Sequence, residues 1–314
     1  MQIKDKRAVF LFPGQGAQYR GMGLDFREKS RACAELFRMA SDILGKDMTA
    51  LLRDSDDETL KRTDVSQPAI TLVNLAAAGY LMEQGILPGA CAGFSLGEYA
   101  ALTVTGVISP EDCFKLVKAR GEAMQASADR IGAGENAPGM AAVLGLAPER
   151  AEALIAEWKI PGLYAANINS PRQMVASGTA EALAEASIRF KEAGAKRVIR
   201  LAVAGPFHSP LIADAAERFS PILESVPFHD PVIPFYSNVS GGQVLAAGEA
   251  KRLSLRQITE PVRWVAEETA VAGSIGAALE TGPGKVLSGL WKDFGSPVPC
   301  YSAGTVADID ILIG

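Results

Sequence analysis

The chain has 314 residues, of which 48% are hydrophobic and 21% charged, and these values predict one large domain, or a large domain with a smaller insert, around a sizeable core. The formal net charge of −5 argues against nucleic-acid binding, which requires a basic surface. The four cysteines are widely spaced with no CxxC pair and the chain has only two histidines, so no metal site or disulfide framework is expected and the cysteines should be reduced. The apolar stretch near the N-terminus is too short for a signal peptide, and no longer run indicates a membrane span, which predicts a cytoplasmic protein that binds no membrane.

The first part of the chain alternates between strand and helix patterns. Ala8–Phe12 is a short apolar run before a Pro-Gly turn, which predicts a buried strand. Helical patterns follow at Ser30–Leu44 and Gln67–Glu83. A second apolar run, Ala90–Phe94, leads directly into a helical stretch, and Ser109 then provides the N-cap of the next helix.

The pattern changes after residues 131–138, a Gly-, Ala- and Pro-rich segment that we interpret as a domain boundary. Six elements follow in the order β-α-β-β-α-β, which is typical of a ferredoxin-like unit. They are expected at Met140–Leu146, Pro148–Trp158, Leu163–Asn167, Gln173–Ser177, Ala180–Ala193 and Lys196–Val203. We therefore predict a small subdomain at 135–203, inserted into a large α/β subdomain formed by 1–134 and 204–314.

The last part of the chain returns to α/β alternation. Helices are expected to begin at Ser209, Pro261 and Gly284, and strands are expected at Val232–Tyr236, Gly276–Glu280 and Val298–Tyr301. The sequence thus predicts a parallel-sheet α/β body with an inserted small domain and a cleft between the two.

A candidate nucleophile, Ser95, lies where the pattern changes from strand to helix. Gly93-Phe94-Ser95-Leu96-Gly97 matches G-x-S-x-G, in which a tight turn lifts the serine hydroxyl out of the sheet. The amide of Leu96 and the helix N-terminus can then face a developing oxyanion. The motif is short and also occurs in plain turns, but the strand before it and the helix after it favour a nucleophile.

A serine nucleophile requires a base, and His208 is favoured over His229. His208 lies in a loop between a strand and a helix, where catalytic groups are common. His229 lies in a proline-bounded connector, where its neighbour Asp230 is able to hold it structurally. The sequence indicates no acidic third member of a triad, and a backbone carbonyl can orient the imidazole instead.

Arg120 is the candidate for binding a substrate carboxylate. On a helix over residues 111–125, it falls in the apolar arc that also contains Met124. A guanidinium there requires an anion or a full set of acceptors. One alternative is a structural ion pair with an Asp or Glu. Beside a candidate acyl-transfer serine, a substrate carboxylate is the better proposal, because Arg binds carboxylates bidentately.

Six segments, taken together and in order, closely resemble the malonyl-CoA:acyl carrier protein transacylase family over almost the whole chain. They are Phe12-Pro13-Gly14-Gln15-Gly16-Ala17-Gln18, Gly93-Phe94-Ser95-Leu96-Gly97-Glu98-Tyr99, Arg120-Gly121, Asn167-Ile168-Asn169-Ser170-Pro171, Pro206-Phe207-His208-Ser209-Pro210 and Gly282-Pro283-Gly284-Lys285-Val286-Leu287. The resemblance implies an α/β-hydrolase-like parallel-sheet body with a ferredoxin-like insert. It also implies an S-malonyltransferase that needs no cofactor and acts on malonyl-CoA and phosphopantetheinylated acyl carrier protein.

The resemblance also implies a role for each matching residue. Ser95 is the nucleophile and His208 its base, the amides of Gln15 and Leu96 form the oxyanion hole, Arg120 binds the malonyl carboxylate, and the main-chain carbonyl of Gln257 orients the histidine. Met124, Asn167 and Phe207 are expected to bind substrate, and the bulk of Phe207 to limit branching at the malonyl α-carbon. The chain departs from the family at Phe94, where a histidine usually precedes the nucleophile, and this leaves the packing and the acyl preference there open.

Several alternatives remain open at this stage. The pathway expected is fatty acid synthesis, with a trans-acting polyketide synthase acyltransferase as the alternative; a serine thioesterase or a non-catalytic carrier-binding scaffold is less favoured. The protein is expected to be a monomer. Because the carrier protein is expected to be acidic and this chain is mildly acidic too, binding of the carrier requires a local basic patch. Two candidate patches are Lys196-Arg197 with Arg200, and Lys251-Arg252 with Arg256.

Overall fold

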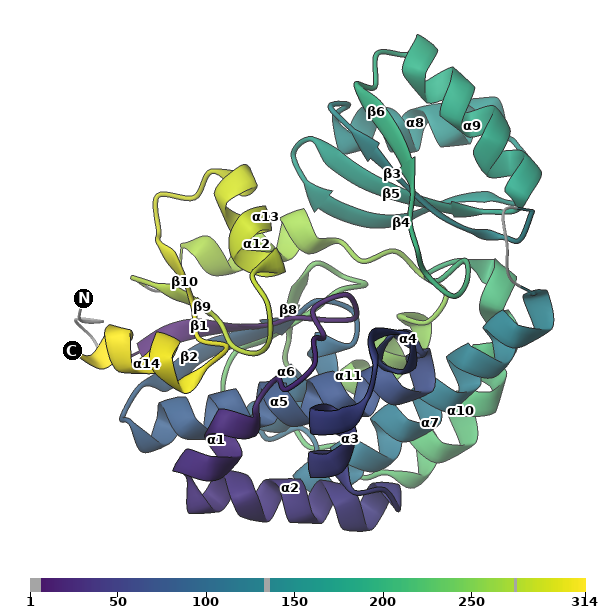
Figure 1. The fold of residues 1–314 in the computed structure, drawn as a ribbon. Coiled ribbons are helices and arrows are strands. Elements are labelled where there is room, and N and C mark those ends of the chain that lie inside the picture. Colours follow the sequence, from purple (N-terminus) through teal and green to yellow (C-terminus); the bar gives the residue numbers. More distant parts are fainter. Residues whose placement is uncertain (1–6, 133–135, 274–275) are drawn as a thin grey trace.

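A six-stranded sheet forms the centre of the larger part of the molecule (Figure 1). The computed structural model describes residues 7–132, 136–273 and 276–314. The strand order is β10-β9-β1-β2-β7-β8, and every neighbouring pair is parallel except β7 with β8. The strands are β1 (Arg7–Phe12), β2 (Leu87–Gly93), β7 (Phe235–Ser237), β8 (Gly242–Val244), β9 (Ala278–Glu280) and β10 (Cys300–Ser302).

The central strand β1 is buried on both faces, which explains why its sequence is continuously apolar. Ala8, Phe10 and Phe12 belong to the large core cluster on one face of the sheet. Val9 and Leu11 belong to a second cluster on the other face. The side chains alternate because successive residues of a strand point to opposite faces.

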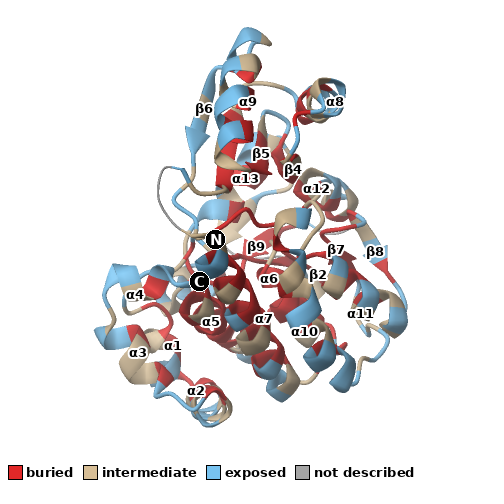
Figure 2. Cartoon of the chain, turned by 90° about the vertical axis from the view of Figure 1, so that its right-hand side faces the viewer, coloured by how far each residue is buried: buried red, intermediate tan, exposed pale blue. Residues whose placement is uncertain are grey.

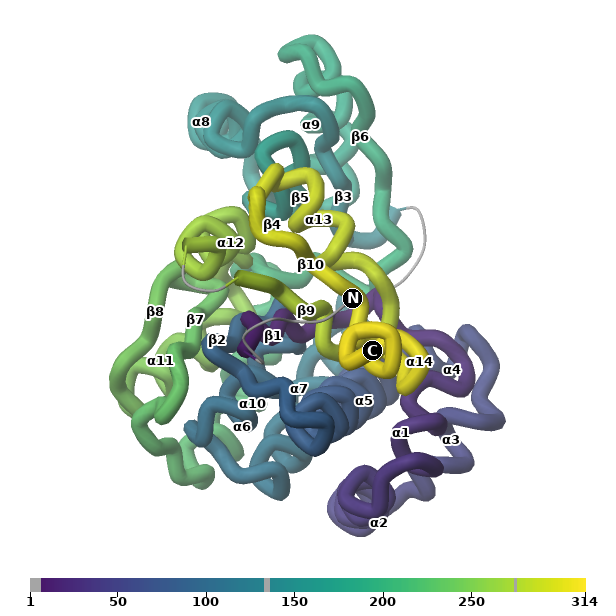
Figure 3. Tube along the Cα trace, turned by 90° about the vertical axis from the view of Figure 1, so that its left-hand side faces the viewer, coloured from purple at the N-terminus to yellow at the C-terminus, as the bar shows by residue number. Residues whose placement is uncertain are grey.

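Helices cover both faces of this sheet. In Figures 1 and 3, α12 (Trp264–Ala272) and α13 (Val286–Phe294) lie on one side, and α5 (Thr63–Glu83), α6 (Gly97–Val104) and α7 (Pro110–Ile131) lie on the other. The remaining helical segments contribute mainly to the side of α5. They are α1 (Leu24–Lys29), α2 (Arg31–Leu44), α3 (Met48–Asp54), α4 (Asp57–Lys61), η1 (Pro210–Ile212), α10 (Ala213–Ser225), α11 (Ala247–Arg256) and α14 (Val306–Ile313).

Helix α5 is the central helix of the core. By length and hydropathy alone it could cross a membrane, which the sequence did not lead us to expect, but 89% of its apolar window is buried inside the protein. Its low amphipathicity has the same cause, since a helix packed on all sides is apolar all round. The cysteines around this core are free, as predicted.

The small unit contains a four-stranded antiparallel sheet in the order β4-β5-β3-β6. Its elements are β3 (Gly139–Leu144), α8 (Pro148–Trp158), β4 (Leu163–Ser170), β5 (Gln173–Gly178), α9 (Ala180–Glu192) and β6 (Arg197–Arg200). The unit has a core of its own, in which Trp158 packs edge-on against Phe190. This arrangement confirms the ferredoxin-like prediction, and Figure 2 shows β6 as its exposed edge. Of the expected boundary segment, 133–135 lie outside the described residues, and the bounds 135 and 203 stay a prediction.

The expected elements are present, with shifts at several ends. The helix expected from Ser209 begins with a 3₁₀ turn and becomes α-helical at Ala213, and β6 ends at Arg200 instead of Val203. Strand β8 and helices α11 and α14 were not expected. The short helices α1, α3 and α4 were also missed, because segments of five to seven residues carry too little periodicity to be recognised.

The contact between α6 and β1 provides a test of the packing around the serine turn. A Cβ atom on Gly97 would lie 2.0 Å from the carbonyl oxygen of Phe12, which is backbone and cannot move aside. We expect Gly97→Ala to lower the free energy of unfolding by about 3 kcal/mol, measured by urea denaturation. Gly79→Ala in α5 is the matched control, because a Cβ there meets nothing within 4 Å and should stabilise the helix by about 0.5–1 kcal/mol. A Gly97→Ala protein as stable as the parent would contradict this packing.

Candidate active site

Ser95 lies in a strained turn between β2 and α6. Its φ angle of 49° is in the left-handed region, which costs a non-glycine residue energy and is typical of functional sites. The flanking glycines are required by close contact, since a Cβ on Gly93 would lie 2.1 Å from the backbone of Gly97. The structure therefore shows the exposed serine turn that the G-x-S-x-G motif predicts.

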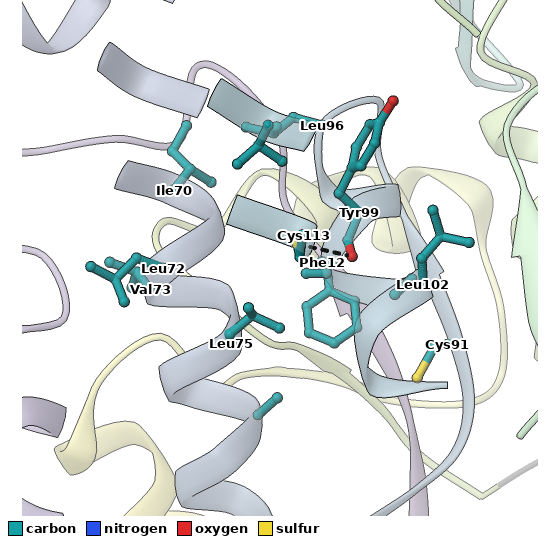
Figure 4. Close-up of a cluster of buried hydrophobic side chains, with 14 of the residues drawn as sticks. Phe12, Ile70, Leu72, Val73, Leu75, Cys91, Leu96, Tyr99, Leu102 and Cys113 are labelled. Atoms are coloured by element: carbon teal, nitrogen blue, oxygen red, sulfur yellow. Dashed lines mark hydrogen bonds between the residues drawn. The ribbon is translucent and has the colours of Figure 1, made fainter. Parts of the chain in front are cut away.

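Helix α6 is held in the core just beyond this turn. Leu96, Tyr99 and Leu102 are buried, and Figure 4 shows them beside the apolar residues of α5 that include Ile70 and Leu72. The Sγ atom of Cys113 donates to the carbonyl oxygen of Tyr99 at 3.5 Å, a contact drawn in the same view and one that ties α7 to α6. The turn that carries Ser95 is therefore followed directly by a helix that is fixed in the core by α5 and α7.

His208 contacts Ser95 directly. Its Nε2 lies 2.9 Å from the Ser95 Oγ, and its Nδ1 lies 2.8 Å from the main-chain carbonyl oxygen of Gln257. A carbonyl oxygen only accepts, so Nδ1 carries the proton and Nε2 is free to accept one from the serine hydroxyl. The carbonyl occupies the position that an acid occupies in a Ser-His-Asp triad. His208 also has a left-handed φ, of 56°. His229 does not line the pocket.

The imidazole of His208 is kept neutral by its surroundings. Burial lowers the pKa of His208 to about 4, and the nearby Arg120 cation acts in the same direction. The carbonyl of Gln257 opposes this shift only in part. At neutral pH the ring is therefore unprotonated and available as a base.

Arg120 is buried beside these two residues, at 1% exposure. Its Nη1 donates to the side-chain Oε1 of Gln67 at 2.9 Å. Its Nη2 donates to the side-chain Oε1 of Gln257 at 3.0 Å and to the Ser95 Oγ at 3.2 Å. The guanidinium carbon lies 5.5 Å from the centre of the Tyr99 ring, within range of a cation–π contact. No salt bridge to Arg120 exists within 7–132, 136–273 and 276–314, so the alternative of an internal ion pair finds no partner there.

The segment that contains Gln15 packs directly against the serine turn. A Cβ on Gly14 would lie 2.3 Å from the carbonyl oxygen of Phe94 and 3.6 Å from the amide nitrogen of Leu96. The Gln15 side chain lines the same pocket as Ser95, and its Nε2 donates to the Thr63 hydroxyl at 3.3 Å. This close approach brings the two segments together, as an oxyanion hole built from both requires.

A pocket of about 520 Å³ opens over the serine turn, between the large body and the small sheet. Most predicted site residues line it: Gln15, Ser95, Arg120, Met124, Asn167, Phe207 and His208. The predicted Leu96 and Gln257 lie behind this surface, where both side chains are buried. The two parts of the molecule are joined at the pocket by a parallel bridge between Asn167 and Val262.

Phe94, the departure from the family pattern, also lines the pocket. Its ring packs edge-on against Trp264, with the ring centres 5.4 Å apart. The side chain at position 94, directly after β2, is therefore one ring of an aromatic pair whose other ring comes from α12.

Three residues of this centre were not predicted from the sequence. Asn238 accepts from the Ser95 amide at 2.6 Å, Glu98 accepts from the Asn238 amide at 2.8 Å, and Gln67 accepts from Arg120. Asn238 follows β7, and polar residues at the carboxyl ends of parallel strands meet at one edge of the sheet, which is a signal that could have identified it. Gln67 is one of two amides in the largely apolar helix α5, the other being Asn74, and its partner on α7 has no sequence signal.

Comparison with known proteins places this serine site in a class. A family model described as "Acyl transferase domain" matches residues 9–287. The malonyl CoA-acyl carrier protein transacylase of Bacillus subtilis (strain 168) is 39% identical over 312 residues, covering 98% of this chain and 96% of the relative. The chain therefore belongs to the malonyl CoA-acyl carrier protein transacylase family of acyl transferases.

Solved structures agree with this assignment. The crystal structure of an acyl carrier protein S-malonyltransferase from Vibrio cholerae has a TM-score of 0.91 and 35% identity, covering 98% of this chain and 99% of that one. A malonyl transacylase in complex with its type II polyketide synthase acyl carrier protein has a TM-score of 0.90 and 33% identity, with the same coverage. The α/β body with a small antiparallel insert is thus the fold of the family.

The neutral state of His208 is directly testable, because the chain has only two histidines. In a His229→Gln variant, the only remaining imidazole signal in a ¹⁵N NMR titration belongs to His208. We expect the signal to show a neutral imidazole down to pH 5 and a titration midpoint near the pKa of about 4 that burial and Arg120 give His208. A midpoint at the ordinary histidine pKa would contradict the burial of His208 beside Arg120. Ser95→Ala is the control, because it removes the hydroxyl that contacts His208 Nε2.

Proposed function

We propose that this protein transfers the malonyl group from malonyl-CoA to the phosphopantetheine thiol of an acyl carrier protein through a malonyl-Ser95 intermediate. The observation that supports this most strongly is the buried Arg120 guanidinium, 3.2 Å from the Ser95 Oγ and without a carboxylate partner among the described residues. A cation at that distance is within reach of the free carboxylate of an acyl group attached to the serine.

In the first half-reaction, the Ser95 Oγ attacks the thioester carbonyl carbon while His208 Nε2 takes the hydroxyl proton. The developing oxyanion is stabilised by the backbone amides of Gln15 and Leu96. The C–S bond then breaks, and the departing coenzyme A sulfur receives the proton from His208. The main-chain carbonyl of Gln257 holds the ring in position and stabilises its transient positive charge.

In the second half-reaction, the carrier protein's thiol gives its proton to His208 and attacks the malonyl ester. The ester C–O bond breaks, and the Ser95 oxygen regains a proton from the imidazolium. Every step uses a proton transfer or an acyl transfer between groups already named, so no resident cofactor is required.

The other pocket residues define the shape of the acyl site. Phe207 and Met124 are buried on the wall of the pocket, and Asn167 contributes an amide from the small sheet. The bulk of Phe207 next to His208 favours an unbranched malonyl α-carbon. Because the site is built from one chain, we propose that the enzyme acts as a monomer, and its free cysteines fit the reducing cytoplasm.

Two rival functions are less well supported. A thioesterase that acts on neutral acyl groups does not require a buried cation beside the nucleophile. A non-catalytic scaffold does not require the Ser95–His208 contact of 2.9 Å. The same chemistry serves fatty acid and polyketide synthesis. We propose fatty acid synthesis, since relatives similar over nearly their full length, such as those of Bacillus subtilis, Haemophilus influenzae and Escherichia coli, carry the transacylase name alone. Trans-acting polyketide synthesis is the alternative.

Intact-mass measurement after mixing with malonyl-CoA tests the covalent step. We expect the protein to gain one malonyl group, to keep it in buffer, and to lose it when phosphopantetheinylated carrier protein is added. Ser95→Ala should gain nothing, because the acceptor oxygen is absent. Rapid loss of the group to water would favour a thioesterase, and malonyl transfer by Ser95→Ala would exclude the covalent mechanism.

The basic patch on the edge strand β6 is the better candidate for docking the carrier protein. Lys196, Arg197 and Arg200 are exposed, and none is in a salt bridge with another described residue. Residues 201–203 follow directly and line the pocket. The alternative patch on α11 is neutralised, since Lys251, Arg252 and Arg256 each pair with a glutamate.

Charge reversal separates these two surfaces. We expect Lys196→Glu with Arg197→Glu to raise the KM for the carrier protein about 10-fold, because the carrier is acidic, while Ser95 loading from malonyl-CoA changes less than about twofold. The matched control, Lys251→Glu with Arg252→Glu, should leave both steps near the parent values. Steady-state transfer assays with varied carrier concentration measure the difference, and an equal effect of both pairs would contradict docking at β6.

A further inference from the structure

The acceptors that hold Arg120 are all neutral: the Ser95 hydroxyl and two side-chain amides. Gln67 and Gln257, from different parts of the fold, present side-chain amide oxygens to the guanidinium at 2.9 and 3.0 Å. The Nε of Arg120 makes no hydrogen bond although it is buried. A buried arginine is usually paired with a carboxylate, so a cation held only by neutral oxygens is unusual.

The position of Gln67 is fixed by its packing. It lies on α5 with no exposed surface, and its Nε2 donates to the Met124 Sδ at 3.3 Å, which leaves Oε1 facing Arg120. Gly121, the next residue after Arg120, allows α5 to approach α7, since a Cβ there would lie 3.0 Å from the Thr63 carbonyl oxygen and 3.5 Å from Gln67. The contact between α5 and α7 thus places the amide oxygen of Gln67 against the guanidinium of Arg120.

The neighbouring carboxyl group of Glu98 is engaged elsewhere. Its Oε1 accepts from the Ser237 hydroxyl at 3.3 Å, and its Oε2 accepts from the Asn238 amide at 2.8 Å. Glu98 therefore forms no direct ion pair with Arg120, although the two groups are close enough to influence each other's charge. The cation is positioned by hydrogen bonds without being neutralised by them.

We propose that Gln67 preserves acyl specificity because the acceptor that it presents to Arg120 is uncharged, so that the substrate carboxylate is the guanidinium's only direct counterion. This inference rests on the proposed function. A carboxylate at position 67 would satisfy Arg120 internally and compete with the malonyl group. An amide gives the same direction and a similar length without that competition. Gln257 provides the second neutral acceptor and shares the bond from Nη2 with Ser95.

Gln67→Glu is the direct test, since it changes the charge of the acceptor and almost nothing of its shape. Single-turnover loading of Ser95 from malonyl-CoA and acetyl-CoA gives kcat/KM for each. We expect the malonyl-to-acetyl ratio to fall about 10- to 100-fold, the range of a charge-assisted hydrogen bond, while acetyl loading changes less than about threefold. Arg120→Ala provides the reference for complete loss of the preference.

Gln67→Met is the matched control, because it removes the acceptor but adds no charge. We expect it to lower both loading rates by similar factors and to keep the ratio within about threefold of the parent, as the cation is then still free for substrate. A ratio that Gln67→Glu leaves unchanged, or that Gln67→Met lowers as much as Gln67→Glu does, overturns the proposal. If Gln67→Glu does not fold, Gln257→Glu puts the carboxylate on the second acceptor and should lower the ratio in the same direction.

The same assays separate failure of this inference from failure of the proposed function. A parent protein that takes up no malonyl group, or an Arg120→Ala protein that keeps the malonyl preference, contradicts the function itself. A parent that loads malonyl with an Arg120-dependent preference, together with an unaffected Gln67→Glu ratio, contradicts only the role of Gln67.

Discussion

The left-handed turn at Ser95 depends on a set of hydrogen bonds from side chains that are themselves buried. Asn238 accepts from the Ser95 amide at 2.6 Å and donates to the Gly93 carbonyl oxygen at 2.7 Å, so one side chain holds both sides of the turn. The Gln257 side chain donates to the Ser95 carbonyl oxygen at 3.0 Å. These bonds offset the backbone strain. They also explain why polar groups from β7 and from the end of α11 are buried behind the pocket.

Carboxyl groups complete this set, and burial decides their state. Glu98 accepts from the Asn238 amide, and Glu267 accepts from the Asn238 side chain at 2.7 Å. Burial raises the pKa of Glu98 to about 7, and burial and the neighbouring Glu98 raise the pKa of Glu267. A protonated carboxyl is less costly to bury than a charged one, so these groups support the turn without placing a full pair of negative charges behind the nucleophile.

The sequence predicted the fold class and the β-α-β-β-α-β insert from local periodicity. It predicted the pairing of Ser95 with His208, 113 residues away, because a serine nucleophile requires a base and the chain has only two histidines. The strand-to-helix change at residue 95 and the loop position of His208 are read directly from periodicity. What the sequence alone did not provide are contacts across long separations. The Gln67–Arg120 and Ser95–Asn238 pairs are 53 and 143 residues apart. The place of Asn238 after a strand indicates the edge of the sheet at which it lies, but no pattern indicates which atoms either pair brings together. The role of the Gln257 carbonyl came only from family resemblance, since any residue can provide a carbonyl.

His208 and Arg120, the base and the carboxylate-binding cation of the proposed function, are also coupled to each other. The Arg120 cation is one of the causes that lower the pKa of His208, second to burial. Under the proposed function, a malonyl carboxylate bound to Arg120 offsets that positive charge, and the pKa of His208 then rises toward its ordinary value. The imidazole therefore becomes a stronger base when the acyl group that the guanidinium selects is in place. Under the proposed function, one buried charge thus takes part in both substrate selection and proton transfer, and neutral amide acceptors leave that charge available for the substrate.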